Sequence, residues 1–169
     1  WGIDTYCIDP GEIARRLDVP GLSAYSVFAD ENSRYARRSA TLDWMRSVSP
    51  AEHGEWFCIE TEAGPMYWVH GSNPRYTSIE DRLLRYWQLV AHGSKAISAW
   101  MYRSRIANAQ AGEFGMLAWD GAPTDRARQT GELSKRLGRY ADLILSRNPA
   151  EPEVAILAVS RSEPKPVWN

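Results

Sequence analysis

The regular alternation of apolar, strand-like runs with helical segments is the feature that most constrains the fold of this chain. Four short runs, rich in apolar and β-branched or aromatic residues, predict strands at Val19–Val27, Glu55–Ile59, Lys95–Tyr102 and Val154–Val159. A helical segment precedes each run. Strands that are apolar along their length are typical of parallel sheets covered by helices, because both of their faces are buried. The sequence therefore predicts an α/β fold.

The first two predicted helices are marked by charged and capping residues at their starts. Asp9-Pro10-Gly11-Glu12 combines a capping aspartate, a proline suited to the first helical position and a glutamate that completes the capping box. Asp30 and Glu31 place negative charge where the second helix begins, and that helix is predicted to run to about Arg46. Each of these helices leads into the next predicted strand.

Two longer helices follow, and each has a predicted apolar face. Ser78 caps the third helix, and Gly93 fits its C-terminal cap. The fourth helix opens at Pro123-Thr124-Asp125 and is predicted to run unbroken to near Asn148. Apolar residues spaced by three and four predict the buried face of each helix. In the third helix these residues are Leu83, Trp87 and Val90. In the fourth they are Leu133, Leu137, Tyr140 and Ile144.

Two architectures fit this alternation, a doubly wound sheet and a (β/α)8 barrel. No glycine-rich phosphate loop follows any predicted strand, which weighs against a nucleotide-binding doubly wound fold. The loops after the second and third strands are much longer than the two to six or so residues usual for such connections. Long polar loops at the carboxyl ends of strands are typical of the functional face of a barrel, so the barrel is favoured.

Composition and charge narrow the possible partners. The net charge of −1 does not indicate a nucleic acid or an anionic membrane surface as a partner. No apolar run approaches the roughly 20 residues that a membrane-spanning helix needs. The two cysteines form no disulfide framework, and the histidines have no metal-ligand spacing, so we expect no metal and no cofactor. The chain begins at Trp1 and carries no visible signal peptide, which leaves the compartment open.

The stretch Trp56–Trp68 carries the main functional prediction. A short apolar run ends at the carboxylate Glu60, and a second carboxylate, a Gly-Pro pair and two aromatic residues follow at once. The chain has eight Trp and eight Tyr in all, and their flat apolar faces suit the C–H faces of sugar rings. An acid delivered to the end of a buried strand beside an aromatic loop is typical of a sugar-hydrolysing site.

Tyr25, Glu60 and Arg103 all fall at or near the carboxyl ends of successive predicted strands, where a closing barrel brings side chains to one cavity. Simpler interpretations stand beside this one. Glu60 would then be a solvated residue at a strand end, Arg103 would cap the sheet edge, and Trp68 would belong to the core. Glu62 is expected behind the site or on the surface. Glu113, in the second long loop, is a candidate for substrate contact.

The run F-C-I-E-T-E-A-G-P-M-Y-W, at Phe57–Trp68, resembles the nucleophile segment of family 42 glycoside hydrolases, the β-galactosidase group of a large retaining (β/α)8 clan. Glu60 and Trp68 match the family pattern in type and spacing. The stretch Leu84–Arg103 resembles the family's next helix and its last barrel strand, which ends in an arginine. Tyr25 is similar to the tyrosine that ends the sixth strand beside the nucleophile, although Ser26 stands where the family usually has proline.

The resemblance implies a retaining glycosidase that acts on a β-galactoside-like sugar through a covalent intermediate, with Glu60 as nucleophile. Tyr25 would keep Glu60 ionised and aimed, Trp68 would stack on the sugar, and Arg103 would support the floor of the site. Gln110 and Glu113 stand where the family motif has a Glu and a His that contact galactose hydroxyls. The family's general acid/base belongs to an Asn-Glu pair on the fourth barrel strand, and this chain has no Asn-Glu dipeptide.

The resemblance also implies how the chain is divided. Residues 1–148 would form a partial barrel, about strands six to eight, and residues 149–169 would form a linker and the first strand of a following α/β domain that supports trimerisation. On this interpretation the chain is a fragment, inactive alone, of a longer homo-oligomeric enzyme with a carbohydrate substrate. The altered motif at Gln110 and Glu113 keeps a second hypothesis open, a non-catalytic carbohydrate-binding or scaffolding barrel.

Overall fold

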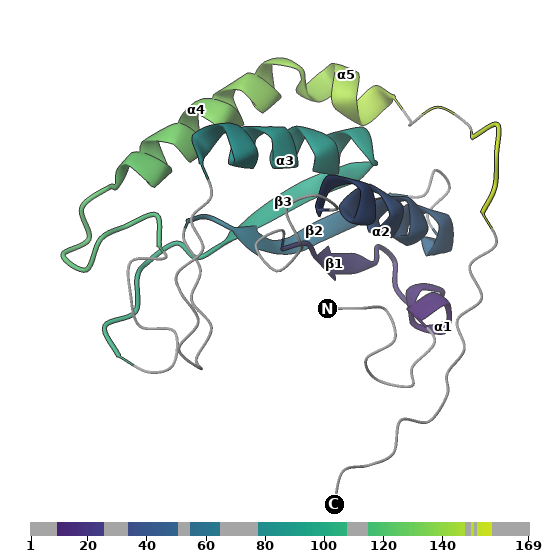
Figure 1. Ribbon diagram of the computed structural model, residues 1–169, viewed down its shortest axis with the longest axis horizontal. Helices are drawn as coiled ribbons and strands as arrows, with labels where there is room; N and C mark the ends of the chain where they lie inside the picture. The colour runs from purple at the N-terminus through teal and green to yellow at the C-terminus, as the bar shows by residue number, and fades with distance from the viewer. Residues whose placement is uncertain are drawn as a thin grey trace, which may run out of the picture.

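The computed structural model of the chain describes residues 10–25, 34–50, 55–64, 78–107, 115–147, 150 and 152–156. Its elements follow one another as α1 (Pro10–Ala14), β1 (Gly21–Ser23), α2 (Arg34–Val48), β2 (Trp56–Glu62), α3 (Ile79–Ala91), β3 (Ser94–Trp100), α4 (Asp125–Arg139) and α5 (Ala141–Ser146). Helices α3, α4 and α5 lie above the three strands in Figure 1, and α2 lies at about the level of β1 and β2, at the right. Leu42 and Met45 of α2 belong to the same core as the buried residues of β2 and α3. The predicted alternation of helices and strands is therefore confirmed through β3.

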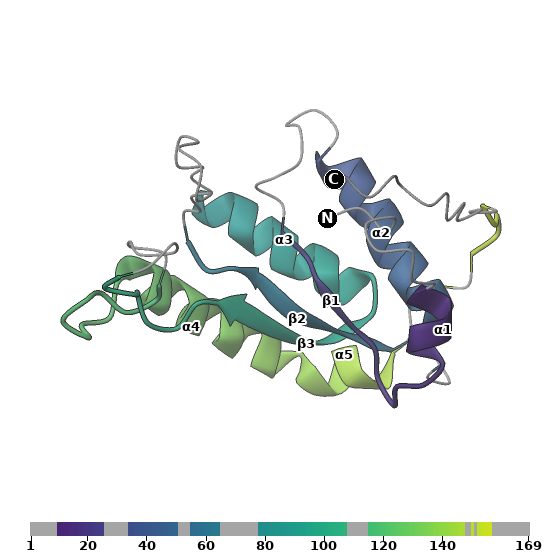
Figure 2. The ribbon, with the colours of Figure 1, turned by 90° about the horizontal axis from the view of Figure 1, so that it is seen from below.

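The three strands form one parallel sheet in the order β1-β2-β3, so neighbours in the sheet are also neighbours in the sequence. Leu22 pairs with Cys58, and Cys58 pairs with Ile97 across the other edge of β2. Figure 2 shows the strands side by side, with the helices behind them. Each connection between parallel strands passes through a helix, as the βαβ pattern requires. This arrangement confirms the predicted α/β class with a parallel sheet.

The core lies between the sheet and the helices. Trp56 and Cys58 of β2 face this side and are almost fully buried, together with Leu42 of α2 and Tyr86 and Leu89 of α3. The intervening β2 residues Phe57 and Ile59 remain 39% and 55% exposed. Among the described residues the sheet is thus covered on one face. The prediction that the strands are buried on both faces is not met by this part of the chain.

Helix α3 begins and ends where the sequence predicts, but it buries a partly different face. Ser78 Oγ accepts a hydrogen bond from the Asp81 amide at 3.1 Å, and Gly93 adopts a positive φ of 93° just after the helix. The predicted stripe of Leu83, Trp87 and Val90 is only partly right. Leu83 packs half-buried against the core and Val90 is half-buried, but Trp87 is exposed. The fully buried residues of α3 are Arg82, Arg85, Tyr86 and Leu89. The two arginines can be buried because each has partners at the end of β2.

The predicted long last helix is divided in two. Thr124 caps α4, as its sequence signal indicates, with its side chain accepting from the Ala127 amide. Leu133 is buried as predicted, whereas Tyr140, predicted on the same face, is 53% exposed at the break between α4 and α5. The Tyr140 amide donates to Leu137 O, a tightened last turn, and Gly138 just before it is a weak helix former.

The carboxyl-terminal end of the chain carries no strand in the part that the structure describes. Residues 152–156 have no regular secondary structure, and Val154 and Ile156 are 78% and 91% exposed. The rest of the predicted strand, 157–159, lies outside the described residues. The division into a partial barrel and a following domain therefore stays a prediction.

Candidate active site

Strand β2 is irregular just before its carboxyl-terminal end, and this irregularity sets the direction of Glu60. Between Cys58 and Glu60, β2 advances two residues while β1 advances one, from Leu22 to Ser23. On the other edge β2 advances three residues, from Cys58 to Thr61, while β3 advances two. An extra residue opposite both neighbours is the signature of a β-bulge, a feature that re-aims side chains and is common beside active sites.

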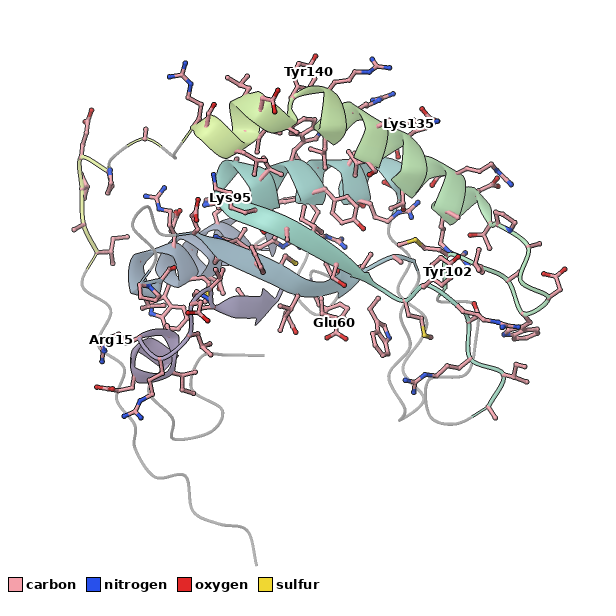
Figure 3. The ribbon with its side chains drawn as sticks, turned by 180° about the vertical axis from the view of Figure 1, so that it is seen from behind. Arg15, Glu60, Lys95, Tyr102, Lys135 and Tyr140 are labelled. Carbon is pink, nitrogen blue, oxygen red and sulfur yellow. The ribbon has the colours of Figure 1, made fainter. Side chains whose placement is uncertain are left out.

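Glu60 projects from the sheet on the side away from the helices (Figure 3). Simple alternation would have placed it on the same side as Trp56 and Cys58, which face the core. Because the extra residue precedes it, the carboxylate instead shares the open side with Ile59 and is half-buried rather than enclosed. The structure thus places Glu60 where a ligand lying on the open face of the sheet can reach it.

Tyr25 and Ser23 of the neighbouring chain segment meet the Glu60 carboxylate. Ser23 Oγ donates a hydrogen bond to Glu60 Oε2 at 3.3 Å, and the Ala24 amide donates to Glu60 O at 2.7 Å. Burial raises the pKa of Tyr25 far above its ordinary value, and the charge of Glu60 and a side-chain hydrogen bond to it raise the pKa further. The structure therefore brings together two of the residues predicted from the sequence, and it adds Ser23, which sequence reasoning missed.

Glu62 turns toward the helices and forms a buried ion pair. Arg85 Nη1 lies 2.5 Å from Glu62 Oε1, and the two side chains are 2% and 0% exposed. Burial lowers the pKa of Arg85, and the charge of Glu62 opposes that change. Thr61 Oγ1 lies 3.0 Å from the other Glu62 oxygen and 2.9 Å from Ala24 O. Glu62 therefore lies behind Glu60, which is one of the two places expected for it. Its partner Arg85 lies among apolar residues of α3, and this position is the sequence feature that could have indicated the pair.

Arg103 lies in the loop after β3. It forms an isolated parallel bridge with Leu117, and its side chain is exposed. Arg105 of the same loop stacks on an aromatic ring: its guanidinium lies 5.3 Å from the ring centroid of Trp100, the last residue of β3. The sequence pattern does not single out this aromatic contact. The predicted contact residues Trp68, Gln110 and Glu113 lie outside the described residues.

Two cavities lie on the helix side of the sheet and are not lined by Glu60. One, of about 190 Å³, lies beside Lys95 between the end of α3 and α5, and the other is a crevice of about 10 Å³ between α3 and α4. Within the described ranges no three His, Cys, Asp or Glu side chains gather closely enough to hold a metal ion. No helix in that part of the chain is long and apolar enough to span a membrane.

A half-exposed carboxylate beside a phenol and a hydroxyl can act as a nucleophile or accept hydrogen bonds from a polyol. Retaining glycoside hydrolysis needs a second carboxyl group about 5–5.5 Å from the first, across the sugar. Glu62 is unsuited to that role, because its carboxylate is buried on the opposite side of the sheet and is paired with Arg85. Of the two carboxylates near the end of β2, Glu60 is the one that can meet a ligand on the open face of the sheet.

Comparison with known proteins points to one family. The family model for glycoside hydrolase family 42, described as beta-galactosidase, matches residues 1–140. Solved structures with a similar fold include Gan42B, a GH42 beta-galactosidase from G. stearothermophilus, with a TM-score of 0.71 and 20% identity over 85% of this chain and 21% of that one. The beta-galactosidase from psychrophilic Marinomonas ef1 has a TM-score of 0.66 and 18% identity, over 85% of this chain and 24% of its own.

A third similar structure is the beta-galactosidase from Bacillus circulans sp. alkalophilus, with a TM-score of 0.69 and 19% identity over 83% of this chain and 20% of that one. At these identities the structural matches establish the fold. The chain spans about a fifth to a quarter of the length of these three proteins. No curated protein matches the chain.

Proposed function

The chain belongs to glycoside hydrolase family 42, and from this premise we propose that it forms the nucleophile-bearing part of a retaining glycosidase that acts on β-galactoside-like sugars. The observation that carries the proposal is the bulge of β2, which turns Glu60 onto the open face of the sheet beside Tyr25. We assign β1, β2 and β3 to the sixth, seventh and eighth barrel strands. The similarity to β-galactosidases of known structure supports this assignment.

In the proposed reaction, a carboxylate oxygen of Glu60 bonds to the anomeric carbon while the bond from that carbon to the leaving oxygen breaks. A carboxylic acid on the opposite side protonates the leaving oxygen. The resulting carboxylate then takes a proton from water, which attacks the anomeric carbon and frees Glu60. We propose that this acid/base group belongs to residues outside this chain, because Glu62 faces the helices and is paired with Arg85.

The other contacts in the proposed site follow from the family pattern. Tyr25 holds the Glu60 carboxylate, Trp68 stacks on the sugar, and Arg103 supports the floor of the site. Gln110 and Glu113 contact the sugar hydroxyls at positions where the family motif has a glutamate and a histidine. The complete protein is proposed to be a homo-oligomer, trimeric by resemblance, with residues 149–169 leading into the domain that supports assembly.

The test is made in a complete protein that carries these residues. A 2-deoxy-2-fluoro-galactosyl fluoride, which stalls the covalent intermediate, should label the peptide containing Glu60 and no other, as read by mass spectrometry. Glu60→Gln should abolish turnover, because an amide cannot form the glycosyl-enzyme. Azide or formate should restore turnover to Glu60→Gly. The exposed Glu132→Gln on α4 is the matched control, and full activity in Glu60→Gln would exclude Glu60 as nucleophile.

A second candidate function is a carbohydrate-binding or scaffolding barrel without catalysis. The replacement of two sugar-contacting residues of the family motif by Gln110 and Glu113 favours it. A binding protein would bind a galactoside in calorimetry yet take up no fluorosugar label in either the original protein or the Glu60 variants. The two functions are therefore separated by the same labelling experiment.

A further inference from the structure

We propose that the buried Glu62–Arg85 ion pair positions Glu60, by holding the end of β2 beyond its bulge against the helical layer; this inference rests on the proposed function of Glu60. Both charged side chains are almost completely buried, and the atoms Arg85 Nη1 and Glu62 Oε1 are 2.5 Å apart. Arg85 lies in the middle of α3, a helix that is capped at both ends. The pair therefore ties the last residue of β2 to a fixed point on the helical layer.

The tie continues from Glu62 to the chain segment that carries Tyr25. Thr61 Oγ1 lies within hydrogen-bond distance of both Glu62 Oε2, at 3.0 Å, and Ala24 O, at 2.9 Å. The Ala24 amide in turn donates to Glu60 O at 2.7 Å. Backbone and side-chain bonds thus run from α3 through the end of β2 to the residue just before Tyr25. Every link lies within two residues of Glu60 or Tyr25.

Stability alone does not account for a pair of this kind. Removing two charges from water is costly, and apolar pairs of similar volume are often as stable or more stable. The best-attested use of a buried polar pair is to specify one arrangement among competing ones. Here the arrangement is the end of β2, where Glu60 and Glu62 face opposite sides of the sheet although they are two residues apart.

A regular strand would not give this arrangement. Residues two apart in a regular strand face the same side, so an unbulged β2 would place Glu60 and Glu62 together with Trp56 and Cys58 on the core side. The extra residue lets Glu60 face the open side, while Arg85 holds Glu62 on the helix side. The pair therefore holds the strand just beyond the bulge, next to Glu60.

The experiment separates positioning from simple stabilisation by removing both charges together. Glu62→Met/Arg85→Met leaves an apolar pair of similar volume and should melt at or above the temperature of the original protein. We expect its rate of fluorosugar labelling at Glu60 to fall on the order of 10²-fold, which is the effect of misplacing a reacting group by about 1 Å. The affinity for the reagent should change little. Arg38→Met, which removes a buried arginine bonded to Gln88, should label within about twofold of the original rate.

A second measurement in the same variants does not depend on catalysis. Hydrogen exchange of the Ala24 amide, which donates to Glu60 O, should accelerate on the order of tenfold in the double variant. The His92 amide, which donates to Gln88 O at the carboxyl end of α3, should exchange as slowly as in the original protein. A double variant that labels and exchanges like the original protein would overturn the inference while leaving the proposed function intact. Accelerated Ala24 exchange in a protein that never labels at Glu60 would overturn the proposed function and support the fixing of β2 by the pair.

Discussion

At the scale of single residues, the contact between Tyr25 and Glu60 determines what the site can do. Burial, the negative charge of Glu60 and a hydrogen bond to it all raise the pKa of the Tyr25 phenol. A phenol whose pKa is raised stays protonated as the pH rises, so it remains a donor throughout the range in which a glycosidase works. Tyr25 is therefore suited to orient a carboxylate and unsuited to act as a base.

Replacing Tyr25 by phenylalanine removes this donor without removing the ring. A hydrogen bond to a charged group contributes roughly 1.5–3 kcal/mol, so labelling of Glu60 by the fluorosugar should slow by about 10- to 10²-fold. Because the raised pKa keeps Tyr25 protonated near pH 10, the labelling rates of the original protein and of Tyr25→Phe should depend on pH in the same way there. Tyr140→Phe, at an exposed tyrosine between α4 and α5, provides the control. Equal rates in Tyr25→Phe and the original protein would remove Tyr25 from the site.

The sequence alone indicates Glu60 but not the direction of its side chain. Glu60 is predictable because it ends an apolar run and precedes an aromatic loop, both of which are local features. The bulge is not predictable in the same way, since alternation along W-F-C-I-E would place Glu60 with Trp56 and Cys58. The extra residue becomes visible only when β2 is paired with both of its neighbours. Ser23 was missed for the same reason.

At the scale of elements, the turn around Gly115 links the end of β3 to the start of α4. Met116 and Leu117 donate backbone hydrogen bonds to Met101 O and Tyr102 O, and Thr124, the cap of α4, donates to Met116 O. Arg126 of α4 donates to Gly115 O through two nitrogens. A side chain at Gly115 would collide with the backbone of Ser104 and lie 2.8 Å from Arg103 C. Close approach of two backbones is therefore the reason for glycine here.

Two glycine substitutions should have opposite effects. Gly115→Ala should loosen the pairing of residues 101–104 with residues 115–117, by about 1–3 kcal/mol, because the backbone of Ser104 must move. Gly131→Ala, inside α4 with no atom near the added methyl group, should stabilise that helix by about 1 kcal/mol. Hydrogen exchange followed by mass spectrometry should show faster exchange in residues 101–104 and 115–117 in the first variant and slower exchange in α4 in the second. Slowed exchange in both would refute the close-approach explanation.

The starts of α3 and α4 were predictable from the sequence, whereas the break between α4 and α5 was not and the buried faces were only partly so. Ser78 and Thr124 mark helix starts because capping is a local interaction. The buried face of α3 depends on distant partners, since Arg82 donates to Ala63 O and Arg85 pairs with Glu62. A rule that assigns charged residues to the surface must fail at such positions.

At the scale of the whole molecule, the sheet has one covered face and one open face within the described residues. Phe57 and Ile59 project from the open face, and the outer edges of β1 and β3 have no neighbouring strand in this part of the chain. Exposed apolar faces and unpaired strand edges both promote association. In the proposed barrel, neighbouring strands would pair with both edges.

The isolated chain should therefore self-associate and be catalytically silent. Sedimentation should show oligomers, and a hydrophobic dye should fluoresce strongly with it. Phe57→Ser/Ile59→Thr should reduce both signals, because it makes the open face polar. Leu84→Ser/Leu143→Thr, which changes two exposed leucines on the helices, should reduce them less. A monomer with a sharp, cooperative melt would contradict this expectation.

The order β1-β2-β3 has a consequence for how this part of the chain is assembled. Each strand pairs with the strand just before it in the sequence, through one intervening helix. A chain growing from its amino end can therefore add each strand to a partner that is already made. The stretches to be closed run from Ser23 to Trp56 and from Glu62 to Ser94, and the entropic cost of closing a loop rises only slowly with its length. Contacts that are this close along the chain favour rapid formation, so these three strands should form early in folding.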